Sequence, residues 1–261
     1  MFNLAALEAA LAGTIFAGKL HFSEVTGSTN TDALAAARAS APNGSVFFSN
    51  EQQAGRGRGD HAWESAAGEG LYVSVLLRPL IGASILPFLP LAAGLACAEA
   101  IRSESGIEID LRWPNDLLIG ERKAGGILIE SKTEGAEVSF AVVGIGINVH
   151  QRSFDSGLST QGTSLDLETG QRIKRQTLLV ALLKSLERES ALLTDRPAVD
   201  EILRRVEQAS TWVRGRRVEV HGPQACIGVT AGIDGNGFLL VRTPEKIVTI
   251  QTGGIRAAEM N

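Results

Sequence analysis

The segment from Gln52 to Gly59 carries two arginines between three glycines. Glycine permits positive φ and lets backbone N–H groups approach a ligand, and a guanidinium offers a planar set of donors suited to phosphate or carboxylate. Arg56 and Arg58 on such a loop therefore indicate an anion-binding site. Arg-Gly runs also occur in disordered RNA-binding segments, so the segment taken alone leaves both interpretations open.

A second polar group follows a predicted strand that ends in Trp113-Pro114. Proline fixes its own φ and restricts the residue before it, so Asn115 and Asp116 are expected at a fixed exit from the sheet. That rigidity suits a positioned carboxylate. The alternative is a turn in which both side chains bond nearby backbone groups.

The third feature is a set of glycines in two neighbouring predicted strands. Lys123 stands just before Gly125-Gly126 and an apolar strand, and Gly144 and Gly146 alternate along the next strand. Alternating glycines remove the side chains from one face of a strand, which suits a flat ligand. A solvated lysine and tight helix-on-sheet packing are the alternatives.

Composition restricts the class of protein. The 261 residues are 44% hydrophobic and 21% charged, which predicts a compact chain with a substantial core. A net charge of −4 argues against nucleic acid as the main partner. Cys97 and Cys226 lie far apart in apolar segments, as reduced core thiols do. The N-terminus lacks the positive region of a signal peptide, and residues 86–100 contain two prolines and Glu99. We therefore expect no membrane span and a cytoplasmic protein.

Strand-like and helical patterns alternate along most of the chain and then give way to short strands. We expect strands over 20–25, 45–50, 71–77, 107–113, 125–132 and 138–148, and helices at the N-terminus and over 28–39, 86–102, 175–193 and 198–208. Four more strands are expected over 217–221, 225–233, 237–242 and 246–250. These patterns predict an α+β protein, with a mixed sheet flanked by helices in residues 1–210 and a small β-barrel or meander in residues 211–261.

In order and spacing, these segments resemble the biotin-protein ligases, also called biotin-[acetyl-CoA-carboxylase] ligases. The resemblance covers nearly the whole chain and rests on Gly27-Ser28-Thr29-Asn30, Gln52 to Arg58, Trp63, Trp113 to Asp116, Lys123 to Glu130 and Gly144 to Val149. It implies a mainly antiparallel, class II synthetase-like catalytic domain followed by an SH3-like barrel. Ser28 lies too near the N-terminus for a winged helix-turn-helix domain to precede it, so we expect the form without DNA binding.

The resemblance implies a two-step reaction. Biotin and Mg-ATP give biotinyl-5'-AMP and pyrophosphate, and a lysine of the biotin carboxyl carrier protein of acetyl-CoA carboxylase then takes the biotinyl group. The implied biotin site comprises Ser28, Thr29, Asn30, Gln52, Arg56, Gly57, Arg58, Lys123, Gly144 and Gly146. The implied ATP and adenylate site comprises Arg56, Arg58, Trp63, Asn115, Lys123 and Asn148.

The catalytic candidates are Lys123, Arg56, Arg58 and Asp116. The positive groups would offset the charge where a carboxylate meets the α-phosphate. Asp116 is left with three candidate roles, as a base, as a Mg²⁺ ligand and as a positioning group.

Two other functions remain open at this stage. Lipoate-protein ligases and octanoyltransferases share the architecture, so the acyl group is not fixed by the fold. A nucleic-acid-binding module would also explain the arginines and the barrel, although only Trp212 and Phe238 could stack bases there. The protein is expected to be a monomer or a homodimer.

Overall fold

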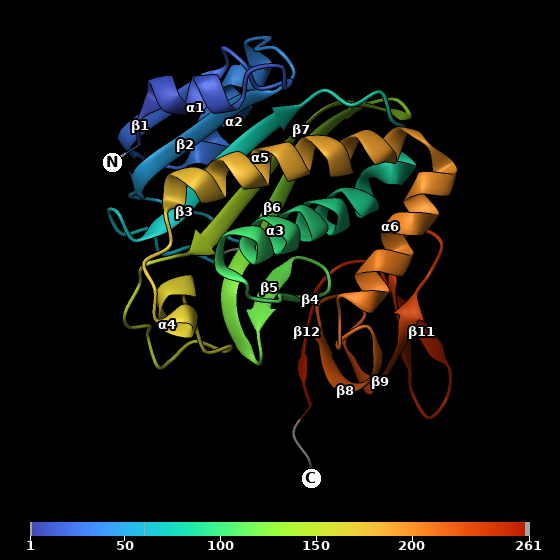
Figure 1. Cartoon of the computed structure of the whole chain (residues 1–261). Helices are drawn as coiled ribbons and strands as arrows, with labels where there is room; N and C mark the ends of the chain where they lie inside the picture. Colours follow the sequence, from blue (N-terminus) through green and yellow to red (C-terminus); the bar gives the residue numbers. More distant parts are fainter. Residues whose placement is uncertain (1, 60, 259–261) are drawn as a thin grey trace.

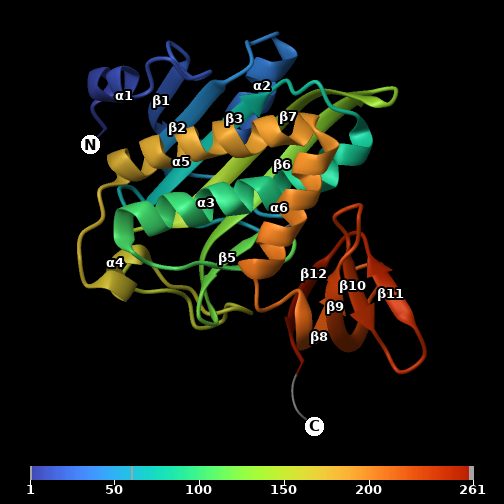
Figure 2. The ribbon, with the colours of Figure 1, turned by 45° about the vertical axis from the view of Figure 1, so that its right-hand side comes forward.

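Two sheets organise the molecule. The computed structural model describes residues 2–59 and 61–258, and within these residues twelve strands form a seven-stranded sheet and a five-stranded sheet. The strand order is β1-β2-β3-β7-β6-β5-β4 in the first and β11-β10-β9-β8-β12 in the second. Figures 1 and 2 show the small sheet at one end of the large one, below α6.

The large sheet is mixed and mainly antiparallel, which confirms the predicted fold class. Only the β1–β2 pair is parallel among the pairs within the described residues. Its strands are β1 (Leu20–Thr26), β2 (Ser45–Gln52), β3 (Gly70–Leu77), β4 (Asp110–Arg112), β5 (Asp116–Ile119), β6 (Arg122–Glu134) and β7 (Glu137–Asn148).

Helices cover the two faces of this sheet unequally. Long helices α3 and α5 lie on one face (Figures 1 and 2), whereas α2 packs on the other. The described helices are α1 (Leu4–Ala10), α2 (Thr29–Arg38), η1 (Ala83–Phe88), α3 (Leu89–Ser105), α4 (Leu165–Thr169), α5 (Arg175–Ala191), η2 (Leu192–Thr194) and α6 (Arg196–Gln208).

Side-chain alternation along the strands separates the two faces. Val75 and Val143 belong to the main core, while Leu76 and Val142 pack with Ala33 of α2 in a second cluster. A period of two sends successive side chains of a strand to opposite faces. The face toward α2 is therefore the one that carries Ser74 and the bare positions of β6 and β7.

The helix over residues 86–102 is confirmed with shifted ends. Pro87 lies in the 3₁₀ turn η1, α3 begins at Leu89 with Pro90 in its first turn, and Gly106 ends it at φ 74°. By length and composition, Ala83–Ser105 could span a membrane. In this structure Ala92 and Cys97 of that helix are fully buried in the core, on the side that packs against α5 and the sheet.

One strand prediction was wrong. A single strand was expected over 107–113, but the structure has β4 at Asp110–Arg112 and a further strand β5 at Asp116–Ile119. The register of β5 on β6 shifts between Leu117 and Leu118, and both side chains are buried. This irregularity removes the alternation by which a strand is recognised in sequence. Asp116 therefore begins a strand and does not sit in a turn.

The C-terminal residues form the small antiparallel sheet. Its strands are β8 (Arg214–His221), β9 (Cys226–Ile233), β10 (Leu239–Arg242), β11 (Ile247–Ile250) and β12 (Gly254–Ala257). The last strand begins at the second of two glycines, Gly254, and was not predicted. The indole of Trp113 donates to the carbonyl of Gly237 at 3.1 Å, which joins this sheet to the large one.

Candidate active site

The candidate site lies on the α2 side of the large sheet, where β6 and β7 have bare backbone. Gly126 pairs with Gly146, and Leu128 pairs with Gly144. A Cβ on Gly144 would collide with the side chain of Asn30, and a Cβ on Gly146 would lie 2.6 Å from the indole of Trp63. The glycines therefore make room for two side chains that come from distant segments.

A buried polar cluster lies at the N-terminus of α2. The hydroxyls of Thr29 and Ser74 lie 2.8 Å apart, and Ser74 donates to Oδ1 of Asn30 at 2.6 Å. Gln52 accepts from the backbone N–H of Thr29 at 2.9 Å and donates to Ser65 at 2.7 Å. Thr29, Asn30 and Ser74 are at most 4% exposed. This region can offer donors and acceptors to a polar ring without bulk water.

Ser28 and Ser74 show what the sequence did and did not reveal. Ser28 is the N-cap residue of α2 and is buried, but its side chain makes no capping hydrogen bond. Ser74 was missed. It is the single serine within a strand that is buried along its whole length, and that signal could have identified it.

Arg56 bonds to a carboxylate. Its two Nη atoms donate to the two oxygens of Glu130 at 3.0 Å each, and Asn30 also donates to Glu130 at 2.9 Å. The side chain of Arg56 is 45% exposed. Next to it, Gly57 N–H donates to the carbonyl of His61 at 2.7 Å, and Arg56 forms an isolated antiparallel bridge with Ala62. The contact between Glu130 and Arg56 was not predicted, because Glu130 was considered only as the last residue of the segment from Lys123 to Glu130.

Arg58 points to the other end of the site. Its Nη1 donates to Oδ1 of Asn115 at 3.2 Å and to the carbonyl of Gly253 at 2.7 Å, so it touches the small sheet as well as the large one. Burial lowers the pKa of Arg58 from its ordinary value, and the nearby charge of Asp116 opposes that shift. Asn115 is itself fixed by donating to the carbonyl of Ile127 at 2.7 Å.

Asp116 is shared by two cations. Lys123 Nζ lies 2.5 Å from Oδ1, and Arg112 donates to Oδ2 at 2.6 Å from Nη2 and 3.0 Å from Nε. Burial alone would raise the pKa of Asp116, but the charges and hydrogen bonds of Lys123 and Arg112 outweigh burial and hold it below its ordinary value. Asp116 is thus an ionised group that holds Lys123 in place.

The predicted Mg²⁺ role of Asp116 is not supported by its surroundings. Both carboxylate oxygens are engaged by cations, and the described part of the chain contains no group of three or more His, Cys, Asp or Glu side chains arranged to hold a metal. The residues present therefore do not form a protein-built magnesium site, and we derive no step through one.

Trp63 lies between the polar cluster at the N-terminus of α2 and the charged groups around Lys123. It covers Gly146, and its ring centroid is 5.6 Å from Lys123 Nζ. Its indole Nε1 is buried and has no hydrogen-bond partner among the described residues. Asn148 donates to the carbonyls of Thr163 at 3.0 Å and Lys123 at 3.3 Å, which fixes the backbone of Lys123.

The structure therefore gathers most of the predicted residues into two connected groups. A polar group contains Ser28, Thr29, Asn30 and Gln52, and a basic group contains Arg58, Asn115, Asp116, Lys123 and Asn148. Trp63 and the glycines lie between them, and Arg56 borders the polar group through Glu130. Such an arrangement can hold a polar ring at one end and neutralise anions at the other.

Comparisons with known proteins identify the family of the chain. A family model described as "Biotin/lipoate A/B protein ligase family" matches residues 22–148. The bifunctional ligase/repressor BirA of Bacillus subtilis is 34% identical over 239 residues, which are 90% of this chain and 73% of that protein. A biotin--[acetyl-CoA-carboxylase] ligase of Mycobacterium tuberculosis is 32% identical over 88% of this chain and 85% of its own length.

A solved structure gives the same result. The biotin protein ligase from Aquifex aeolicus in complex with biotin and ATP superposes with a TM-score of 0.78 at 28% identity, and the match covers 92% of this chain and 98% of that one.

Proposed function

Because the chain belongs to the biotin/lipoate A/B protein ligase family and is a ligase of the biotin protein ligase type, we propose that it adenylates biotin and transfers the biotinyl group to a carrier-protein lysine. A biotin carboxylate oxygen attacks the α-phosphorus of ATP, and pyrophosphate leaves. The lysine amine then attacks the acyl carbon, loses a proton, and AMP leaves. The acceptor would be the carrier protein of acetyl-CoA carboxylase, as in the name of the mycobacterial relative.

The observation that carries this proposal is the Lys123–Asp116 contact at the basic end of a bare-backbone strip. In the first step two anionic groups must meet, so a fixed ammonium at that point lowers the barrier. We assign Lys123 to the biotin carboxylate and the α-phosphate, and Arg58 to the adenylate phosphate.

The other predicted residues take supporting roles in the proposal. Ser28, Thr29, Asn30 and Gln52, with Ser74, would bind the ureido ring, since the hydroxyl and amide groups of Thr29, Asn30, Gln52 and Ser74 already form one network and Ser28 is buried beside it. Gly144 and Gly146 would form the floor of the site, with Asn30 and Trp63 packed on them, and Arg56 and Gly57 would close over the ligand. Trp63, Asn115 and Asn148 would contact the adenylate, because Trp63 and Asn148 contact Lys123 and Asn115 bonds to Arg58.

Among the three roles considered for Asp116, the geometry favours positioning. A carboxylate with a lowered pKa is a weaker base, and both of its oxygens already accept from cations. The magnesium ion that accompanies ATP would be bound mainly by its phosphates. A cytoplasmic location and a monomeric or homodimeric state stay predictions, and so does the absence of a DNA or membrane partner.

The test is exchange of labelled pyrophosphate into ATP, measured in parallel with biotin, lipoate and octanoate. The proposal predicts exchange with biotin alone. Exchange with lipoate or octanoate in place of biotin would assign the chain to the other branch of the family. No exchange with any of the three acids would contradict the proposed adenylation.

A further inference from the structure

The guanidinium of Arg112 is held both at its edge and on its face. Besides its two bonds to Asp116, Nη2 donates to the hydroxyl of Thr160 at 3.0 Å. The central carbon lies 5.1 Å from the ring centroid of Trp212. Arg112 is only 6% exposed. A carboxylate, a hydroxyl and an indole together leave the guanidinium little freedom to turn.

Trp212 supplies the face of this clamp. It is 1% exposed and lies where the chain passes from α6 into β8. The central carbon of Arg216 also lies over the indole, 3.9 Å from the ring centroid, and Arg216 donates to Glu121 at 2.6 Å. The indole therefore contacts two guanidinium groups, and such contacts gain strength when water is excluded. It connects the start of the small sheet to Arg112 at the end of β4.

The net charge of Arg112, Asp116 and Lys123 determines how strongly Lys123 can attract an anion. A lysine paired with one carboxylate forms a neutral pair and attracts anions weakly. Arg112 takes Oδ2 of Asp116 and leaves Oδ1 for Lys123, so the three groups together carry one net positive charge. The site can thus fix its lysine with a carboxylate and still present positive charge to a phosphate.

We propose that Arg112 is a positioning residue for adenylate formation, clamped by Thr160 and Trp212 so that Asp116 orients Lys123 without cancelling its charge. The inference rests on the proposed function and adds three residues to it that lie outside the predicted site. It also assigns a role to the junction between the sheets, since Trp212 belongs to that junction.

The test is steady-state adenylation by Arg112→Ala, with and without millimolar methylguanidinium. Loss of the guanidinium should lower kcat by roughly 10- to 100-fold, the range expected when a reacting group is misplaced. The KM for biotin should stay within about twofold, because the ureido end of the site is untouched; added methylguanidinium should restore part of kcat by refilling the same space. A merely structural role predicts no such rescue.

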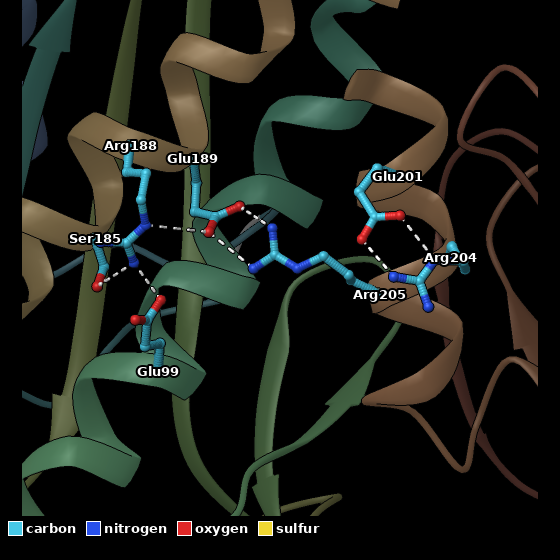
Figure 3. Close-up of polar contacts among 7 residues, drawn as sticks. All are labelled: Glu99, Ser185, Arg188, Glu189, Glu201, Arg204 and Arg205. Carbon is cyan, nitrogen blue, oxygen red and sulfur yellow. Dashed lines mark hydrogen bonds and ion pairs between the residues drawn. The ribbon is translucent and has the colours of Figure 1, made fainter. Parts of the chain in front are cut away.

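Arg205→Ala is the matched control. Arg205 also donates through two nitrogens to a buried carboxylate, Glu189, at 2.8 Å each, but on helices away from the site (Figure 3). Its loss should reduce stability and leave kcat per folded molecule unchanged, with or without methylguanidinium. Arg204→Ala removes a more exposed partner of Glu201 and serves as the mild version of the same control.

Two further variants keep the inference testable if Arg112→Ala does not fold. Arg112→Lys retains the charge but cannot form the same planar contacts, so kcat should fall several-fold. Thr160→Val removes one hydrogen bond and should have a smaller effect of the same kind. Wild-type kcat in both would overturn the inference, and so would an equal loss in Arg112→Ala and Arg205→Ala.

The wild-type protein separates this inference from the proposed function. If the wild type shows exchange with biotin or lipoate, the kcat of each variant can be compared with the kcat of the wild type for that acid. This ratio of kcat values alone decides the role of Arg112. Absence of exchange with every acid overturns both.

Discussion

Lys123, at the basic end of the site, and Arg56, at the polar end, are held in different ways. Lys123 shares a largely buried carboxylate with Arg112, and these groups come from three neighbouring strands. Arg56 is 45% exposed, comes from a tight loop, and pairs with one carboxylate, Glu130. The first end has its charge positioned before a ligand arrives. At the second end the arginine can exchange a carboxylate for a ligand at small cost.

The free energies of exposed and buried ion pairs support this difference. An exposed ion pair contributes about 0.2–1 kcal/mol, whereas removing one partner of a buried pair costs about 3–5 kcal/mol. A phosphate can therefore compete for Arg56, but Asp116 and Lys123 should stay together through the reaction. The following changes test that contrast, starting with the largest effect.

Lys123→Ala should have the largest effect. Removing the preformed ammonium should lower adenylate formation by roughly 100- to 1,000-fold, as for other groups that meet developing charge. Single-turnover formation of biotinyl-5'-AMP measures this directly. Lys132→Ala is the control, because Lys132 lies on the same strand and pairs only with exposed Glu134. Equal rates in the two variants would remove Lys123 from the proposed site.

Asp116→Asn should have the next largest effect. The amide keeps the shape but removes the charge that holds Lys123, so we expect kcat to fall by roughly 10- to 100-fold. Asp200→Asn, at an exposed pair with Arg196, should leave the rate unchanged. An unchanged rate in Asp116→Asn would show that the lysine needs no partner.

Glu130→Gln should have a small effect in the opposite direction. Releasing Arg56 from its carboxylate removes a competitor for ligand, and an exposed pair of this strength corresponds to at most about a fivefold lower Kd for a biotinyl-adenylate analogue. Isothermal titration measures the change. Glu137→Gln, on the adjacent strand, is the control. Weaker analogue binding by Glu130→Gln would show that Glu130 serves the bound state.

The smallest expected effect is that of Asp116→Asn on the pH dependence of the free energy of unfolding. The pKa of Asp116 is lowered in the folded protein, so its stabilising contribution is complete above the unfolded pKa of about 3.9 and is lost as pH falls through the folded value. Urea unfolding between about pH 5 and pH 3 should therefore show a steeper loss of stability for the wild type than for Asp116→Asn. Parallel curves would mean that Asp116 titrates normally in the folded state.

The sequence predicted the parts of the site that lie in local patterns. Glycine spacing identified Gly144 and Gly146, and the loop motif identified Arg56 and Arg58. The family resemblance placed Lys123 and Asp116 in one site, and the structure brings them into contact. The fold class followed from the alternation of apolar residues.

What was missed depends on contacts between distant segments. Glu130 binds an arginine 74 positions earlier, and Trp212 contacts Arg112 from the junction between α6 and β8. No local period records such pairs. Strand β5 was missed because a register shift buries two successive leucines, Leu117 and Leu118.

The most direct test of the contrast is a pair of crystal structures, one of the chain alone and one grown with biotin and ATP. We predict that Asp116 keeps both Arg112 and Lys123 in the two structures, and that Arg56 leaves Glu130 for the ligand when biotinyl-5'-AMP is bound. A Lys123 that joins Asp116 only in the complex, or an Arg56 that still binds Glu130 beside the adenylate, would contradict the account.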